Sequence, residues 1–250
     1  MRKEELSGGG IFLVLAALAI ILSYLGFLLA ANPVGPDSIA SVNNSSKAVT
    51  SAIMFNVSGG NISTFNITAT VQNPRWKGFV GNMTGRFTLD DAAGQTIFDW
   101  TLSTVTGRVY ATSNSSTIGW PTINCSNSTF LNTENTIMAH SNVNDNITKT
   151  FNATNDSFYG THNAFFVGAV SIGANSCPTL NTYISDVSQN TDFEEMALYS
   201  APNTVYATIL EEDTVGYNGQ RFDFQMIVPD NGSAGYTSAI PYYVYVELGT

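Results

Sequence analysis

The strongest structural signal in the chain is the segment Phe222-Asp-Phe-Gln-Met-Ile-Val228, in which apolar residues take every second position. Asp223 and Gln225 lie between them. Successive side chains of a β-strand point to opposite faces of a sheet, so this alternation predicts a strand with one buried face and one polar face. Such strands are typical of antiparallel sheets that carry a core on one side.

The same period of two recurs upstream, at residues 65–71, 86–90 and 98–102. The last two segments are separated by Asp91-Ala-Ala-Gly94, a turn that predicts a hairpin. Residues 192–199 follow the potential cap Thr191 and predict a short connecting helix. Further strands are predicted at 47–57, 105–112, 164–172, 204–210 and 242–248.

This succession of short strands and polar turns predicts a mainly β fold. We expect an antiparallel β-sandwich of immunoglobulin-like or jelly-roll type, with a strand order that the sequence leaves open. The final strand, Tyr242–Leu248, is strongly β-prone and carries one charge, at Glu247. Two interpretations stay open for it: a central strand that buries tyrosines in the core, or an unprotected edge available for strand addition between subunits.

The N-terminal region contains a potential membrane segment. Residues 11–31 carry no charge, and about 20 such residues cross a bilayer as a helix. Arg2 and Lys3 precede the segment and the next basic residue is Lys47, so the positive-inside rule places the N-terminus in the cytoplasm. The predicted layout is a cytoplasmic tail at 1–10, a transmembrane signal anchor at 11–31, a spacer at 32–46 and an extracellular domain at 47–250.

The processing of this segment has three interpretations. We predict an uncleaved anchor, because the apolar stretch is longer than that of a secretory signal and Leu28 disfavours an A-x-A site. Cleavage as an ordinary signal peptide is the second interpretation. The third takes Gly8-Gly-Gly10 as a prepilin-type site, with the apolar helix as the core of a filament.

Asparagine is frequent in the context N-x-S/T, which suits a surface protein that carries glycans on its turns. An Asn- and Thr-rich β protein also forms such sequons by composition alone. The 13 predicted glycosylation sites are Asn43, Asn44, Asn56, Asn61, Asn66, Asn82, Asn114, Asn124, Asn127, Asn146, Asn152, Asn155 and Asn231.

Residues 123–161 differ in texture from the rest of the exported part, because they are rich in Asn and poor in apolar residues. They predict a long excursion with one or two weak strands. Cys125 and Cys177 are the only cysteines of the chain. An exported domain normally oxidises such a pair, so we predict a disulfide between them; two separate buried thiols are the alternative.

Composition disfavours several classes of function. The net charge is −10 and no run of basic residues occurs, so nucleic-acid binding is not expected. His140 and His162 are the only imidazoles and lie 22 positions apart, which disfavours both a zinc site and a Ser nucleophile with its base. Phosphate-binding glycine motifs and the G-x-S-x-G elbow are absent from the sequence. We therefore predict no enzyme activity and no cofactor.

Two groups of potential ligands remain. Acidic residues at predicted strand ends could hold calcium, although solvated turn acids are the simpler interpretation; they are Asp90, Asp91, Glu211, Glu212 and Asp213. The segment Asn142-Val-Asn-Asp-Asn146 partly mimics the ligand spacing of a calcium loop. Aromatic residues could form a carbohydrate-binding face, although core packing is the commoner role. The aromatic candidates are Trp76, Phe79, Trp100, Trp120, Tyr242, Tyr243 and Tyr245.

Several motifs resemble those of a known group of proteins. Residues 76–85 (WKGFVGNMTG), 89–94 (LDDAAG) and 98–100 (FDW) are similar to the pattern W-x-G-[YF]-x-G-N-x-[ST]-G … L-D-D-x-x-G … [YF]-x-W of an uncharacterised family of archaeal membrane-anchored surface proteins. Residues 107–111 (GRVYA) are similar to a further motif of the family, G-x-[VI]-Y-A. The chain departs from the family at Val80, where a second aromatic residue is expected, and at Arg108, where an acid is expected. The resemblance implies an exported β-rich module on an archaeal cell and brings no catalytic residues.

The sequence thus favours a non-enzymatic cell-surface or envelope protein, single-pass, with its glycosylated C-terminal domain outside the cell. Its partners would be the membrane, through residues 11–31, and copies of itself or surface glycans. An extracellular module that binds glycans or another partner is the first alternative. A pilin-like filament subunit is the second, and a secreted hydrolase is the least favoured.

Overall fold

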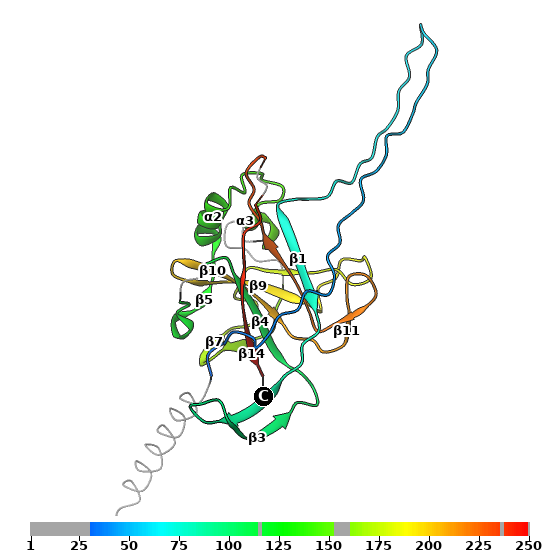
Figure 1. The fold of residues 1–250 in the computed structure, drawn as a ribbon. Helices are drawn as coiled ribbons and strands as arrows, with labels where there is room; N and C mark the ends of the chain where they lie inside the picture. Colours follow the sequence, from blue (N-terminus) through cyan, green and yellow to red (C-terminus); the bar gives the residue numbers. More distant parts are fainter. Residues whose placement is uncertain (1–30, 115–116, 153–160, 236–237, 250) are drawn as a thin grey trace, which may run out of the picture.

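The computed structural model describes residues 31–114, 117–152, 161–235 and 238–249. Its largest unit is an antiparallel six-stranded sheet ordered β14-β4-β10-β9-β5, in which β8 also pairs with β9 (Figure 1). The mainly β fold with antiparallel pairing is therefore confirmed. The strands are β4 (Gly107–Thr112), β5 (Asn124–Cys125), β8 (Thr179–Asn181), β9 (Glu194–Ser200), β10 (Asn203–Ile209) and β14 (Tyr243–Leu248).

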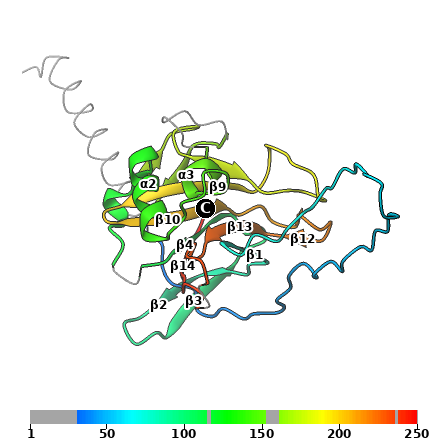
Figure 2. The ribbon, with the colours of Figure 1, turned by 90° about the horizontal axis from the view of Figure 1, so that it is seen from above.

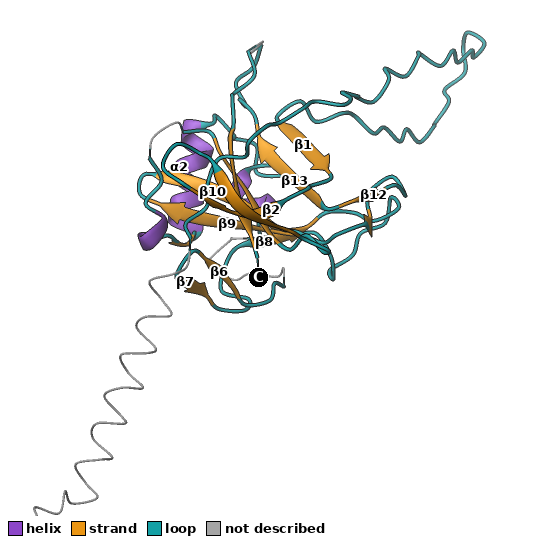
Figure 3. Cartoon of the chain, turned by 60° about the horizontal axis from the view of Figure 1, so that its bottom comes forward, coloured by secondary structure: helices purple, strands orange, loops and turns teal. Residues whose placement is uncertain are grey.

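Both faces of the central strands are buried. On β9 and β10, Ala197 and Tyr206 join one apolar cluster, whereas Leu198 and Val205 join a second cluster on the opposite face. Two strands and two helices cover the first face: β1 (Trp76–Gly81), β13 (Phe224–Pro229), α2 (Ser128–Ile137) and α3 (Ile147–Thr150) (Figure 3). A hairpin and a turn of 3₁₀ helix cover the second face: β6 (Phe165–Val167), β7 (Val170–Ile172) and η1 (Trp120–Thr122).

The helix predicted at 192–199 is wrong, because this segment is the central strand β9. Its acids Glu194 and Glu195 gave the segment a helix-like N-terminus, but both are buried, at 7% and 0% exposure. Pairing with β10 on one side and with β5 and β8 on the other outweighs the local helical preference. A strand buried on both faces has no polar alternation by which to recognise it.

Most other predicted strands are present. The predicted hairpin consists of β2 (Arg86–Asp90) and β3 (Thr96–Thr101), with Gly94 at a φ of 77° in the turn. The segment 164–172 is a hairpin, β6–β7, and not a single strand, because the chain turns at Gly168 with a φ of 55°. Residues 221–229 divide into β12 (Arg221–Phe222), which pairs with β11 (Thr214–Val215), and β13.

In its described residues, 123–152 and 161, the Asn-rich excursion forms two helices and one short strand, where one or two weak strands were expected. Asn127 and Asn146 are the N-caps of α2 and α3: their Oδ1 atoms accept from Phe130 N at 3.0 Å and from Lys149 N at 2.7 Å. Asn is a preferred N-cap, so the residues that suggested loop instead start the helices. Asn135 then joins the two helices, since its Oδ1 accepts from Ile147 N at 2.7 Å.

The predicted disulfide is present. Cys125 lies in β5 and Cys177 lies two residues before β8, and both strands pair with the same side of β9. The bond therefore joins two short strands that together form the edge of the sheet opposite β14.

The two strands predicted at 47–57 and 65–71 are absent. Residues 47–72, which we call the arm, extend away from the body as two exposed legs without strand pairing (Figure 2). Residues 32–45, which we call the strap, connect the described N-terminal end to the arm. The strap pairs with β14 at one point, where Val34 and Val246 form an isolated bridge.

The predicted membrane segment lies outside the described residues, apart from Ala31. Within the described part of the chain, every helix is too short or too polar to cross a bilayer.

Candidate interaction surface

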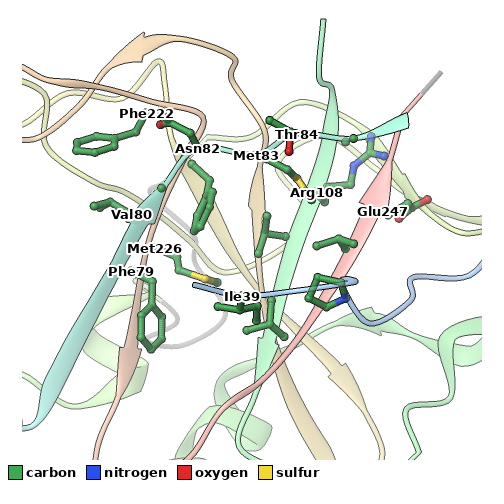
Figure 4. A pocket seen from close by; sticks show the side chains of 18 of the residues that line it. Ile39, Phe79, Val80, Asn82, Met83, Thr84, Arg108, Phe222, Met226 and Glu247 are labelled. Carbon is green, nitrogen blue, oxygen red and sulfur yellow. The ribbon is translucent and has the colours of Figure 1, made fainter. Parts of the chain in front are cut away.

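A groove lies between the β1–β13 ribbon and the β4–β14 edge of the sheet (Figure 4). Phe79 and Val80 of β1 line one side, and Met226 of β13 lies beside them. Val244 and Leu248 of β14 line the other side, and the strap crosses the groove at Ile39. We refer to this space as the groove.

The size of the groove decides what kind of ligand suits it. Its volume is about 3510 Å³. Small-molecule sites are typically about 300–1,000 Å³ and enclose most of the ligand. The groove is several times larger and open along its length, so a polypeptide segment suits it better than a metabolite.

The outer edge of β14 faces the groove and is largely unpaired. Val246 exchanges two backbone hydrogen bonds with Val34, at 3.0 and 2.7 Å, so its amide and carbonyl point away from β4. Because a strand alternates, the backbone groups of Val244 and Leu248 point the same way. Within the described residues, those two have no backbone partner on that side.

The outer edge of β1 is similar. Asp230 N donates to Arg75 O at 2.7 Å, and this fixes which backbone groups of β1 face β13. By alternation, Gly78 and Val80 point their amides and carbonyls outward, and no described residue bonds to them there. The groove therefore has an open strand edge on each side. The final strand was predicted to be either central or an unprotected edge. The structure combines features of both: β14 is an edge strand, and it also packs Val244 and Leu248 against the core.

A second exposed apolar surface is the β2–β3 ribbon. Ile97 is 80% exposed, and Phe98 and Trp100 contact each other with ring centroids 4.9 Å apart on the outside of the molecule. An exposed ion pair between Arg86 and Asp99, at 2.7 Å, joins the two strands. This ribbon borders the groove through Phe87.

The predicted calcium ligands do not come together. Asp90 accepts from Thr88 Oγ1 at 2.9 Å, and hydrogen bonds from Thr96 and Thr88 lower the pKa of its carboxyl. Asp91 closes the β2–β3 turn by accepting from the amides of Ala93 and Gln95. Glu211, Glu212 and Asp213 follow β10 instead. Among the described residues, no three His, Cys, Asp or Glu side chains form a group that could hold a metal ion.

The calcium-like segment 142–146 has a structural role at the base of the arm. Asp145 accepts from Asn73 Nδ2 at 2.8 Å and pairs with Arg75 at 3.2 Å, both through Oδ2. Its backbone carbonyl accepts from Trp76 Nε1 at 2.9 Å. Asp145 thus connects the excursion to the point where the arm returns to the body.

The body contains a set of buried carboxyls that the sequence analysis did not predict. Burial raises the pKa of Glu134, Glu194 and Glu195, and that of Glu195 most clearly. Glu195 Oε2 accepts from Ile227 N at 2.8 Å and Thr204 Oγ1 donates to Glu134 at 3.1 Å, so each makes one hydrogen bond. These buried glutamates could not be found from the sequence, because its pattern does not distinguish them from glutamates on surface turns and helices.

Glu211 completes this set at the end of β10. Burial, with the nearby charges of Glu194 and Asp192, raises its pKa to about 8. Glu194 lies near Glu211, and two ionised carboxylates repel each other at a site that is partly removed from water. One of the pair therefore holds a proton at neutral pH.

Both histidines hold backbone groups. His162 Nε2 accepts from the amides of Ser176 and Cys177, each at 3.1 Å, so the proton lies on Nδ1, which donates to Asn163 O at 2.8 Å. Burial lowers the pKa of His162, in keeping with a neutral ring. His140 Nε2 donates to Asp230 O at 2.7 Å. These imidazoles serve the fold around the disulfide and around β13.

The aromatic candidates are divided between different places. Trp120 is buried between Tyr110 and Tyr245 on one face of the sheet. Trp76 packs edge-on against His140 on the opposite face. Phe79 and Tyr242 also lie on that face, with ring centroids 6.4 Å apart. Tyr243 is exposed on β14, and Trp100 lies on the β2–β3 ribbon.

The predicted glycosylation sites are mostly accessible. Seven are exposed and five are half-buried, including the caps Asn127 and Asn146; Asn155 lies outside the described residues. The exposed sites are Asn43, Asn44, Asn56, Asn61, Asn66, Asn82 and Asn124, and the half-buried sites are Asn114, Asn127, Asn146, Asn152 and Asn231.

Comparison with known proteins adds no relative to this description: no protein-family model, no curated protein and no solved structure matches the chain.

Proposed function

We propose that the chain is a non-enzymatic cell-surface or envelope protein, anchored by residues 11–31, that presents a glycosylated β-rich domain for structural or adhesive contacts. The observation that carries this proposal is the disulfide between β5 and β8, which closes one edge of the main sheet. Disulfides persist in oxidising compartments, and the charge-free segment at 11–31 supplies a route there.

The distribution of polar groups supports the same role. Both imidazoles bind backbone groups, and the predicted sequons are mostly exposed. The proposed protein has an immunoglobulin-like or jelly-roll sandwich, a single N-terminal transmembrane helix and glycosylated asparagines. It would also be a member of the archaeal family that the motifs resemble.

Protease treatment of intact cells tests the location. We expect the domain to be digested from outside, because an N-in topology leaves every residue after the anchor exposed. An internal protein must survive the same treatment as a control. If the domain survives until lysis while an external control is digested, the proposed topology is wrong.

A further inference from the structure

The arm has the pattern of an amphipathic hairpin that lacks its sheet. Its legs, 47–57 and 61–71, meet at a turn in which Gly60 has a φ of 85°. Phe55 and Phe65 face each other with ring centroids 4.9 Å apart, and Lys47 Nζ donates to Thr70 O at 2.9 Å. The Phe pair places odd-numbered positions of one leg opposite odd-numbered positions of the other.

The odd-numbered positions carry most of the apolar residues. In leg 47–57 they include Val49 and Ile53, which are 97% and 92% exposed, and in leg 61–71 they include Ile67 and Val71, at 81% and 84%. The even-numbered positions are largely Thr and Asn, although Met54 and Ile62 also lie there. Asn56 and Asn66, two of the three predicted glycosylation sites of the arm, fall on this second face. Asn61 is odd-numbered but lies beside the turn, so glycans at Asn56 and Asn66 would leave most of the apolar face free.

The exposed apolar area of the arm is that of an interface. Its seven large odd-numbered apolar residues expose the equivalent of about five whole side chains, on the order of 500 Å² of apolar surface. One partner of a standard interface contributes about 800 Å², of which roughly 60% is apolar. The largest apolar patch on a typical soluble monomer has a similar area, about 300–600 Å², and is often functional. The residues are Val49, Ile53, Phe55, Val57, Phe65, Ile67 and Val71.

The base of the arm directs it away from its own body. Asp145 binds Asn73, Arg75 and Trp76 at the point where the chain enters β1. In both views of the ribbon the arm extends from this point away from the main sheet, and Gln72, at its C-terminal end, is the arm residue that lines the groove. The apolar face can therefore be buried by another molecule more readily than by the same one.

The groove offers the complementary surface. It has open backbone edges at β1 and β14, an apolar lining that includes Phe79, Met226 and Val244, and room for a polypeptide. Lys47 is the only charged residue of the arm, so entry would bring little charge into this lining. Anionic lipid is a poorer partner, because an arm with a single basic residue gains little electrostatic attraction there.

We propose that the arm of one copy enters the groove of a second copy, adds its legs to the open edges of β1 and β14, and buries its odd-numbered face. Main-chain hydrogen bonds would supply affinity, and the alternating side chains would fix the register. Arm and groove are different surfaces, so the contact is head-to-tail and extends into a chain of subunits unless it closes into a ring. This inference names the partner within the proposed structural role and rests on that role for its biological setting.

Charge substitutions in the full-length protein test the arm. The double variant Phe65→Asp/Ile67→Asp places two acids on the apolar face and keeps the sequon at Asn66. Its matched control, Thr64→Asp/Thr70→Asp, places the same charges on the other face of the same leg. We expect the first to weaken self-association in detergent solution at least tenfold, measured by analytical ultracentrifugation, and the control to associate like the wild type.

A second pair of variants tests the groove. Val80→Glu puts a charge at the open edge of β1, and Val187→Glu, at a 64% exposed residue outside the groove, is its control. We expect Val80→Glu to weaken self-association at least tenfold and Val187→Glu to associate like the wild type. Mixing it with the arm variant should restore association as 1:1 pairs, since one copy then keeps a sound arm and the other a sound groove.

The outcomes separate the interpretations. Two defective variants that fail to complement each other would overturn the head-to-tail contact. Unchanged association of Val80→Glu, the result expected of arm-to-arm association, would overturn the role of the groove, and unchanged association of the arm variant would overturn any role of the arm. A synthetic peptide of residues 47–72 gives a measurement independent of the folding of the variants: it should inhibit association of the wild type, and binding to neutral or anionic vesicles instead would overturn the proposal. Because these measurements use purified protein, they stand whether or not the cell-surface location holds.

Discussion

The arm and the β9–β10 hairpin each consist of two legs joined by a turn, yet the arm is exposed along its length and the hairpin is buried in the main sheet. The arm has clear period-two alternation and forms no strand. The β9–β10 pair begins with two glutamates, has little alternation, and is central in the main sheet. Alternation thus reports which face of a segment can be buried, and it does not report whether the chain itself supplies the partner.

The difference lies in the neighbours. β10 pairs with β4, and β9 pairs with both β5 and β8, so both outer edges of the central hairpin are paired with strands of the same chain. The arm has no neighbour beyond its own two legs in the described structure. An isolated two-stranded hairpin is marginally stable in water, which accounts for the missing ladder.

The largest expected effect is the loss of stability on removing the disulfide beside β9. Replacing both Cys125 and Cys177 with Ser should cost about 4 kcal/mol of unfolding free energy, because the bond closes a loop of about 50 residues in the unfolded chain. Hydrogen exchange should rise in β5, β8 and β9, and exchange in the arm should stay as it is. Equal protection of β9 in the oxidised and Ser forms would show that the disulfide does not support the sheet.

Two matched truncations compare the regions directly. Leu198→Ala, at a fully buried residue of β9, should cost about 3 kcal/mol through lost burial and a cavity. Ile67→Ala in the arm, at 81% exposure, should cost less than about 0.5 kcal/mol in the monomer. Urea unfolding of monomeric protein measures both. A cost at Ile67 close to that at Leu198 would mean that the arm packs on its own body in solution.

The sequence was sufficient for segments whose two faces differ. β2, β3, β13 and β14 were found because one face is apolar and the other polar or exposed. It failed at β9, where both faces are buried, and in the excursion, where Asn side chains cap helices through contacts that need the folded chain. It also failed at the arm, because a strand needs a neighbour that the sequence pattern does not name.

The candidate surface was harder to predict than the fold. The sequence left the final strand open to two interpretations, a central strand or an unprotected edge, and β14 lies at the edge of the sheet. Nothing in the sequence placed β1 opposite it, since the two strands are separated by more than 160 positions and meet only through β13 and β4. The groove is a consequence of tertiary packing, and so are the buried carboxyls.

A smaller expected effect is the pH dependence of stability, which involves Glu211 in the body and no group in the arm. The pKa of Glu211 is raised to about 8 in the folded state, above its ordinary value of 4.5, so the folded state holds the proton more tightly. Its contribution to stability is full below pH 4.5 and is lost as the pH rises towards 8. Since Glu211 is only half-buried, we expect about 1 kcal/mol, or roughly 2–4 °C in Tm.

Glu211→Gln should remove this part of the pH dependence. The amide keeps an acceptor for Phe193 N and does not ionise, so the variant should melt higher than the wild type at pH 9 and at the same temperature at pH 4. Calorimetry across that range measures it. Parallel curves for both proteins would show that Glu211 does not hold a proton in the folded state. The arm contains no carboxyl, so its exposure to protease should not change with pH in this range.

The smallest expected effect concerns the joint between the two regions. Asp145→Asn keeps the shape of the side chain and weakens the charge-assisted contacts to Arg75 and Asn73, at a cost of about 0.5–1 kcal/mol. Because Arg75 is a trypsin site that this contact protects, cleavage there should become roughly two- to fivefold faster, if local opening limits the reaction. Asp99→Asn is the control: it breaks the exposed Arg86 pair, which is worth about 0–0.5 kcal/mol, and should leave cleavage at Arg75 unchanged. Cleavage at the exposed Lys47 provides an internal reference in each digest. If Asp145→Asn cuts at Arg75 no faster than Asp99→Asn does, then Asp145 does not hold the base of the arm, and the arm is free to fold back over its own groove.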